Sequence, residues 1–231
     1  VLWRQADIFR SSMGGRNQAT TEPWEALAAI AAAAVANALV GVAAAPDMAA
    51  ASAFIVTLSD KAFGVLRDKS LSKSAKLGQF RTMLRDNFAL EDIGNRLIRR
   101  YRNQITPAQY AAYQAVFPEF VTNVYAARLF EFPDAQVKVV RTLPRGTRGD
   151  VDVYTRIATG TGNPVEAIWA TRKSAAGKWQ VTNLTVSGVN VALTQEADFS
   201  AYIQKNGFDA LIEFLRSANA KNGITISGKT K

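Results

Sequence analysis

The residue types that most often carry out chemistry in proteins are absent from this chain. Its 231 residues include no Cys and no His. Their absence excludes disulfides, thiol nucleophiles, Cys/His zinc sites, Ser-His-Asp triads and imidazole acid–base catalysis. The carboxylates do not follow a calcium-loop pattern either, so we expect no metal ion and no cofactor.

Paired carboxylates are the remaining candidates for acid–base chemistry. Asp150 and Asp152 share one face of an expected strand, beside Arg148. This position flanks a hairpin, where charged side chains usually keep a sheet edge soluble. Glu91 and Asp92 are adjacent at the start of an expected helix, where acidic residues are favourable near the positive helix end. Neither pair predicts a catalytic site, and we expect the protein not to be an enzyme.

Basic residues outnumber acidic ones by 28 to 19, for a net charge of +9. They are densest at Arg96, Arg99 and Arg100, which would share one face if they lay on a helix. A solvated face is the simplest interpretation, and docking to an anionic partner or a lipid headgroup is the alternative. Nucleic acid is not expected, because stacking aromatics are not interleaved with these arginines.

An alanine-rich apolar run occupies residues 26–45, preceded by Arg10 and Arg16 and followed by small residues. This order is typical of a secretory signal peptide, so we assign residues 1–46 to a signal region, with cleavage near Ala45 or Ala51. Residues 1–12, ahead of Met13, are open to interpretation as an over-extended reading frame. An uncleaved membrane anchor remains the alternative, because about 20 apolar residues can span a bilayer.

The mature chain begins with helical patterns and continues with strand patterns. Apolar residues at helical spacing predict three helices between residues 53 and 101. The segment TPAQ at residues 106–109 has the order of a capping box with proline at the first helical position, so a long helix should begin at Pro107. Two further helices are predicted after residue 197, and residues 221–231 have the composition of a polar tail.

Period-two alternation predicts strands at residues 136–143, 151–158, 165–173 and 178–189. The separators are too short for crossover helices, so the strands should form a four-stranded antiparallel meander. Helices before and after such a sheet predict one α+β domain over residues 47–220, with the helices packed on one sheet face.

A stripe of aromatic and aliphatic side chains runs along the long helix and must face a large apolar region. From the pattern alone it is either a filled core or one wall of a ligand pocket. For a pocket, the helical candidates are Tyr113, Phe117, Phe120, Val121 and Val124. The inward-facing strand candidates are Val153, Ile168, Val181 and Leu184, an assignment that a one-residue error in strand register would invert.

Several motifs between residues 80 and 215 resemble the MlaC/Ttg2 family of periplasmic lipid-binding proteins, which includes the hopanoid-associated HpnM proteins. The motifs are FRTML at residues 80–84, TPAQ at residues 106–109 with the aromatics that follow it, and WQVTNLTVSGVN at residues 179–190. In the last segment Asn183 and Asn190 stand where the family usually has Asp and Ser. The basic position that follows in the family corresponds here to Gln195 or Glu196, which favours the hopanoid-associated branch or an unusual cargo.

The resemblance implies an NTF2-like cone whose sheet and helices enclose an apolar cavity for acyl chains. It adds Phe88, Ile93, Leu97 and Tyr125 to the expected lipid-binding residues. It also implies a shuttle that carries phospholipid or a hopanoid-like lipid as cargo. The expected partners are an inner-membrane ABC transporter complex and an outer-membrane lipoprotein complex. A small-molecule enzyme on the same cone and a cavity-free interaction module remain the alternatives.

Overall fold

A computed structural model describes residues 47–130, 133–158 and 163–227. The expected signal region therefore lies outside the described residues. The first half of the described chain contains α2 (Met48–Arg67), α3 (Lys73–Asn87), α4 (Leu90–Leu97) and α5 (Pro107–Leu129). The three predicted early helices and the long helix from Pro107 are thus confirmed.

The starts of α2 and α5 are capped by side chains that accept hydrogen bonds from free backbone N–H groups. The Asp47 carboxylate caps α2 by accepting from the Ala50 N–H at 3.0 Å. The capping box at α5 forms as predicted: Gln109 N–H donates to Thr106 Oγ1 at 3.2 Å, and Thr106 N–H donates to Gln109 Oε1 at 2.9 Å. Such caps satisfy donors that a helix cannot pair internally.

An antiparallel sheet follows, in the order β1-β2-β3-β4-β5. Its strands are β1 (Gln136–Arg145), β2 (Asp150–Ala158), β3 (Val165–Lys173), β4 (Trp179–Val186) and β5 (Val189–Asn190). The predicted meander is confirmed, with one difference. The last predicted strand is divided by a tight turn at Ser187 and Gly188, both at positive φ, and its end becomes the two-residue β5.

Two C-terminal helices complete the α+β fold: α6 (Val191–Asn206) and α7 (Phe208–Ser227). Gly207, at a φ of +86°, makes the sharp turn between them, a conformation that other residues rarely adopt. Helical backbone continues to Ser227, so it extends into the polar tail expected from residue 221.

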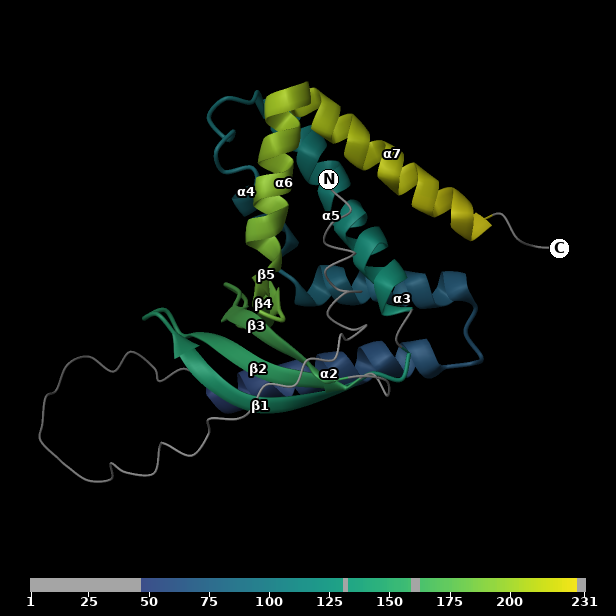
Figure 1. The fold of residues 1–231 in the computed structure, drawn as a ribbon, viewed down its shortest axis with the longest axis vertical. Coiled ribbons are helices and arrows are strands. Elements are labelled where there is room, and N and C mark those ends of the chain that lie inside the picture. The colour runs from purple at the N-terminus through teal and green to yellow at the C-terminus, as the bar shows by residue number, and fades with distance from the viewer. Residues whose placement is uncertain (1–46, 131–132, 159–162, 228–231) are drawn as a thin grey trace, which may run out of the picture.

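The sheet and α2 form the lower part of the molecule, and α4 to α7 form a helical group above it (Figure 1). Helix α2 runs along the sheet, and β1 is its main contact. It is the one helix in the described part of the chain that is long and apolar enough to cross a membrane, with a mean hydropathy of 1.4. Its residues Ala51 and Ile55 are fully buried among side chains from the sheet.

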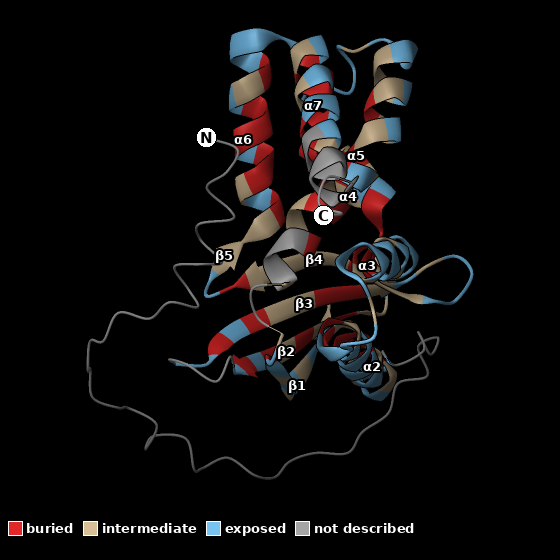
Figure 2. Cartoon of the chain, turned by 90° about the vertical axis from the view of Figure 1, so that its right-hand side faces the viewer, coloured by how far each residue is buried: buried red, intermediate tan, exposed pale blue. Residues whose placement is uncertain are grey.

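Buried residues fall into separate clusters rather than one central core (Figure 2). One lies within the helical group and includes Tyr113, Phe199 and Leu211. The others lie between the sheet and helices α2 and α3. Within the helical group, α4 approaches α5 so closely that a Cβ built on Gly94 would lie 2.8 Å from Phe117 Cδ1.

This contact predicts that Gly94→Ala destabilises the fold, whereas Gly78→Ala does not. At Gly94 the added methyl meets the Phe117 ring, and overpacking of this kind typically costs about 1–3 kcal/mol. At Gly78, also in a helix, no atom lies within 4 Å of the added Cβ, so alanine should stabilise by about 0.5–1 kcal/mol. Urea denaturation of both variants measures the difference, and equal stabilities would contradict the close packing of α4 on α5.

Candidate functional site

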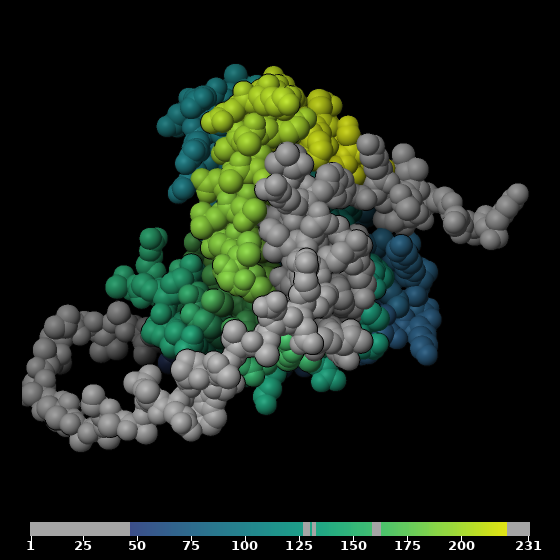
Figure 3. Space-filling view, viewed as in Figure 1, coloured from purple at the N-terminus to yellow at the C-terminus, as the bar shows by residue number. Residues whose placement is uncertain are grey.

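A large apolar cavity lies where the sheet, α2, α3 and the helical group meet. The centre of a water-sized sphere can move through about 220 Å³ of it. Leu58 and Phe63 of α2 and Phe80 of α3 line it opposite Trp169 and Leu184 of the sheet. Helix α6, in yellow-green, runs from the top of the molecule down to the sheet (Figure 3), and its first residues line the cavity. The cavity wall is therefore built from both halves of the chain.

Most of the residues that the sequence assigned to lipid binding meet in this cavity. The helical group and the segment before it contribute Phe88, Ile93, Leu97, Phe117, Phe120, Val121, Val124 and Tyr125. The sheet contributes Val181 and Leu184. The structure thus brings together side chains that are almost 100 residues apart in the sequence, although the lipid contact itself stays a prediction.

Three assigned residues do not line the cavity. Tyr113 is fully buried in the helical group, where its ring stacks on Phe117 and its hydroxyl donates to the Gly94 carbonyl at 3.0 Å. Val153 faces the helices as expected, but it is fully buried in the cluster that contains α2 residues Ala51 and Ile55. The assignment of both to a ligand surface was wrong because neighbouring side chains already cover them.

The inward orientation predicted for Ile168 was also wrong, by one residue of register. Its neighbours Ala167 and Trp169 line the cavity, and successive strand residues point to opposite faces of a sheet. Ile168 pairs with Tyr154 of β2, which lies between the buried residues Val153 and Thr155. Ile168 therefore belongs to the outer face.

The cavity wall is uncharged. No Asp, Glu, Lys or Arg is among its lining residues in the described part of the chain. Its polar side chains include Tyr125, Thr182, Asn183 and Gln195. Burial raises the pKa of the Tyr125 hydroxyl above its ordinary value of 10.0, so this group is neutral at physiological pH. Such a wall can exclude water and hold apolar chains.

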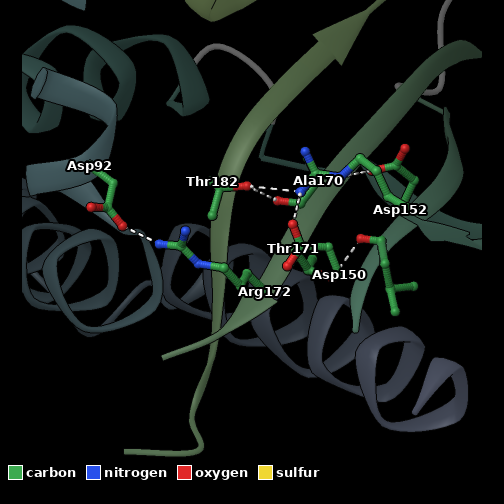
Figure 4. A network of polar contacts seen from close by, with 9 residues as sticks. Asp92, Asp150, Asp152, Ala170, Thr171, Arg172 and Thr182 are labelled. Carbon is green, nitrogen blue, oxygen red and sulfur yellow. Dashed lines mark hydrogen bonds and ion pairs between the residues drawn. The ribbon is translucent and has the colours of Figure 1, made fainter. Parts of the chain in front are cut away.

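Asp150 and Asp152, one of the two carboxylate pairs considered for acid–base chemistry, lie on the outer face of the sheet. Arg145 reaches both: its Nη2 lies 3.4 Å from Asp150 Oδ2, and its Nε lies 3.1 Å from Asp152 Oδ1 without hydrogen-bond alignment. Burial raises the pKa of Asp152 above its usual range, opposed by Arg145 and reinforced by Asp150. Figure 4 shows Asp150 and Asp152 beside β3, from which Arg172 extends toward Asp92. Asp150 and Asp152 therefore form structural ion pairs with Arg145.

The basic cluster differs from the predicted helical face, because α4 ends at Leu97. Arg99 and Arg100 follow in a series of turns. Arg99 Nε donates to Glu196 Oε1 at 2.7 Å, and the Glu196 side chain is only 7% exposed. Arg99, Arg100 and the half-exposed Leu193 line a shallow surface groove beside α6. Arg99 is therefore partly structural, while Arg100 remains exposed.

The family model described as MlaC protein matches residues 57–217. The chain belongs to the MlaC family. A solved structure with the same fold is a phospholipid-binding protein from Ralstonia solanacearum, determined in complex with a phospholipid at 1.53 Å. The two chains superpose with a TM-score of 0.63 at 22% identity, over 75% of this chain and 98% of that chain. The predicted MlaC/Ttg2 membership is confirmed, and the HpnM branch stays a prediction.

Sequence reasoning missed part of the cavity wall of this MlaC-family chain. Leu58, Ala62 and Phe63 of α2 line it, as do Trp169 of β3 and Phe214 of α7. Helical spacing identified the apolar face of α2, but that face is shared between the sheet and the cavity. The spacing of apolar residues does not distinguish these two kinds of contact. For Trp169, a correct strand register would have been the necessary signal.

Proposed function

We propose that this protein is a periplasmic lipid carrier, which holds the acyl chains of a membrane lipid in its apolar cavity and moves the lipid between membranes. The observation that supports this most is the uncharged cavity, lined mostly by apolar side chains from both halves of the chain. Membership of the MlaC family and the likeness to a phospholipid-binding protein support the same function. Phospholipid is the first candidate for the cargo, and a hopanoid-like lipid is the second.

The energetics of lipid transfer explain why a carrier needs such a cavity. At about 0.8 kcal/mol per methylene, a two-chain lipid with about 30 methylenes faces a cost on the order of 20 kcal/mol in water. A carrier must therefore cover nearly all of both chains. Apolar walls do this without covalent chemistry, so the absence of His and Cys is compatible with the function. The lack of charged groups in the described wall also argues against a small-molecule enzyme.

In this proposal the protein is the soluble component of an ABC-type lipid transport system. It would exchange lipid with an inner-membrane transporter complex and an outer-membrane lipoprotein complex. Arg96, Arg99 and Arg100 are the proposed docking residues, and the net charge of +9 favours anionic surfaces on those complexes. Such electrostatic docking raises the encounter rate more than the affinity, which suits a carrier that must leave again.

The cavity assignment predicts that Val124→Trp lowers lipid occupancy while the fold persists. Val124 lines the cavity, so an indole at this position would fill space that acyl chains need. Val140→Trp is the matched control, because Val140 is 57% exposed on β1. Organic extraction of each purified protein, followed by lipid mass spectrometry, gives the occupancy and identifies the cargo. Wild-type occupancy in Val124→Trp would contradict the cavity as the lipid site, and a wild-type protein without lipid would contradict the function.

The docking assignment predicts that Arg96→Glu/Arg100→Glu slows lipid delivery to envelope membranes and leaves bound lipid unchanged. Neither arginine forms an ion pair with another residue of the described chain, so reversing them should not disturb the fold. Delivery should also become less sensitive to salt, because exposed charges are screened. Arg99 is left in place, since its reversal would set a like charge against the buried Glu196. Unchanged delivery and unchanged salt sensitivity would show that the basic cluster is a solvated surface with no role in docking.

If the protein is exported and its signal peptide is removed, we expect the mature chain to begin at Pro46 rather than at Ser52. Cleavage after Ala51 would remove the Asp47 cap of α2 and the fully buried Ala51. Loss of a cap alone costs about 1 kcal/mol, so the product that begins at Pro46 is the more stable of the two. N-terminal sequencing of protein isolated from the cell envelope measures this. A start at Ser52, or an intact residue 26–45 segment, would contradict the expectation.

A further inference from the structure

A surface groove runs along α6, beside the chain segment that joins α4 to α5 (Figure 1). Two hydrogen bonds hold this segment on the helix. Arg99 Nε donates to Glu196 Oε1 at 2.7 Å, and the Tyr101 hydroxyl donates to the Ser200 carbonyl at 3.1 Å. The lining residues of α6 cover about three helical turns. The two sides of the groove are therefore fixed relative to each other.

The groove is basic, because its one acidic group is already paired. Glu196 is the only carboxylate among its lining residues in the described chain, and its side chain is 7% exposed against Arg99. The Arg99 side chain stays 62% exposed, and its bond to Glu196 uses only Nε. Its two Nη groups remain available to a partner. The buried carboxylate thus orients an exposed guanidinium, so less freedom is lost when an anion binds.

Two further side chains give the groove its chemical character. Arg100 lines it, is exposed and forms no ion pair within the described chain. Leu193 also lines it and is 50% exposed, and it is the one exposed large apolar side chain among the described residues of α4 to α7. Leu193 lies three residues before Glu196, about 4.5 Å along the helix axis. Apolar surface and positive charge therefore lie side by side, which suits a ligand that is both apolar and anionic.

The shape of the groove favours a protein segment over a membrane surface. Between the longer side chains, small ones line it: Ala197, Ser200 and Ala201. A bilayer is flat over the width of a protein, so it would meet the longer side chains and leave the space between them empty. One exposed leucine also gives a weak hold on a membrane, because membrane binding grows with the buried apolar area. A single protein segment is narrow enough to enter the groove.

We propose that the groove binds a short acidic segment of a partner protein, with carboxylates on Arg99 and Arg100 and an apolar side chain on Leu193. This inference rests on the proposed docking role of the basic cluster and names the chemistry of the partner. Carboxylates match the planar donor fork of a guanidinium, and the apolar contact adds a short-range constraint to that attraction. Arg96 is not among the lining residues, so its part is limited to long-range attraction.

Site-specific photo-cross-linking in the cell envelope tests this proposal. The photoreactive amino acid p-benzoylphenylalanine is placed at Gln204, an exposed residue that lines the groove. As a control it is placed at Val140 on β1, which is 57% exposed. Mass spectrometry then identifies the cross-linked peptide. We expect the Gln204 position, and not the Val140 position, to label a protein segment that carries carboxylates and an apolar residue within about two helical turns.

The identified segment, made as a fluorescent peptide, is then titrated with the full-length mature protein. We expect Arg100→Gln and Leu193→Ser each to weaken binding about fivefold, the size of one exposed ion pair or one half-buried apolar contact. Lys205→Gln removes a charge from an exposed position of the same helix outside the groove, and Val140→Ser removes an exposed apolar group elsewhere. Both controls should bind as the wild type does. Added salt should weaken the wild type more than Arg100→Gln.

Cross-linking to lipid alone would overturn the proposal in favour of a membrane surface, and cross-linking to a second copy of this chain would overturn it in favour of self-association. A labelled segment without carboxylates, or equal yields at Gln204 and Val140, would also overturn it. So would a peptide that binds Arg100→Gln as tightly as the wild type. Lipid extraction from the same cells separates this result from the carrier function. Bound lipid without a groove ligand overturns the groove alone, and a groove ligand without bound lipid contradicts the carrier alone.

Discussion

The need to keep a large apolar space open inside a stable fold is the constraint on which the rest of this structure depends. An unfilled cavity loses the dispersion contacts that a packed core would make, so its walls must be held by packing behind them. The separate buried clusters provide this. Phe117 and Phe120 line the cavity and also contact Phe199 edge-on or tilted, with ring centroids 6.4 Å apart. Each ring is part of the wall and of the core behind it.

The same constraint explains where charge lies. Ionised groups in the wall would bind water and weaken the cover over an apolar ligand. The ion pairs instead lie outside, as in Arg145 with Asp150 and Asp152, and Arg99 with Glu196. Helix α6 shows the division within two adjacent residues, since Gln195 lines the cavity and Glu196 turns to Arg99. A helix places successive side chains about 100° apart, so two adjacent residues can lie in the apolar cavity wall and in an ion pair outside it.

Most of the fold follows from local signals in the sequence. The capping box at Thr106 and Gln109 marked the start of α5, and period-two alternation located the strands. The face of the sheet on which each strand residue lies was harder to predict. Ile168 was placed inward because a curved strand between two short loops gives no local cue to its register, and a one-residue shift reverses the outcome. The end of α4 was also missed, because Arg99 and Arg100 continue the helical pattern while the chain turns.

The candidate site was predictable where one element supplies a run of wall residues, as α5 does from Phe117 to Tyr125. It was not predictable where the outcome depends on what another element covers. Val153 faces inward, and only the position of α2 removes it from the cavity. Gln195 and Glu196 are both polar in the sequence, yet in the folded chain Gln195 lines the cavity and Glu196 pairs with Arg99. The rotation of α6 against its neighbours therefore decides which of the two residues belongs to the cavity wall, and that rotation exists only in the folded chain.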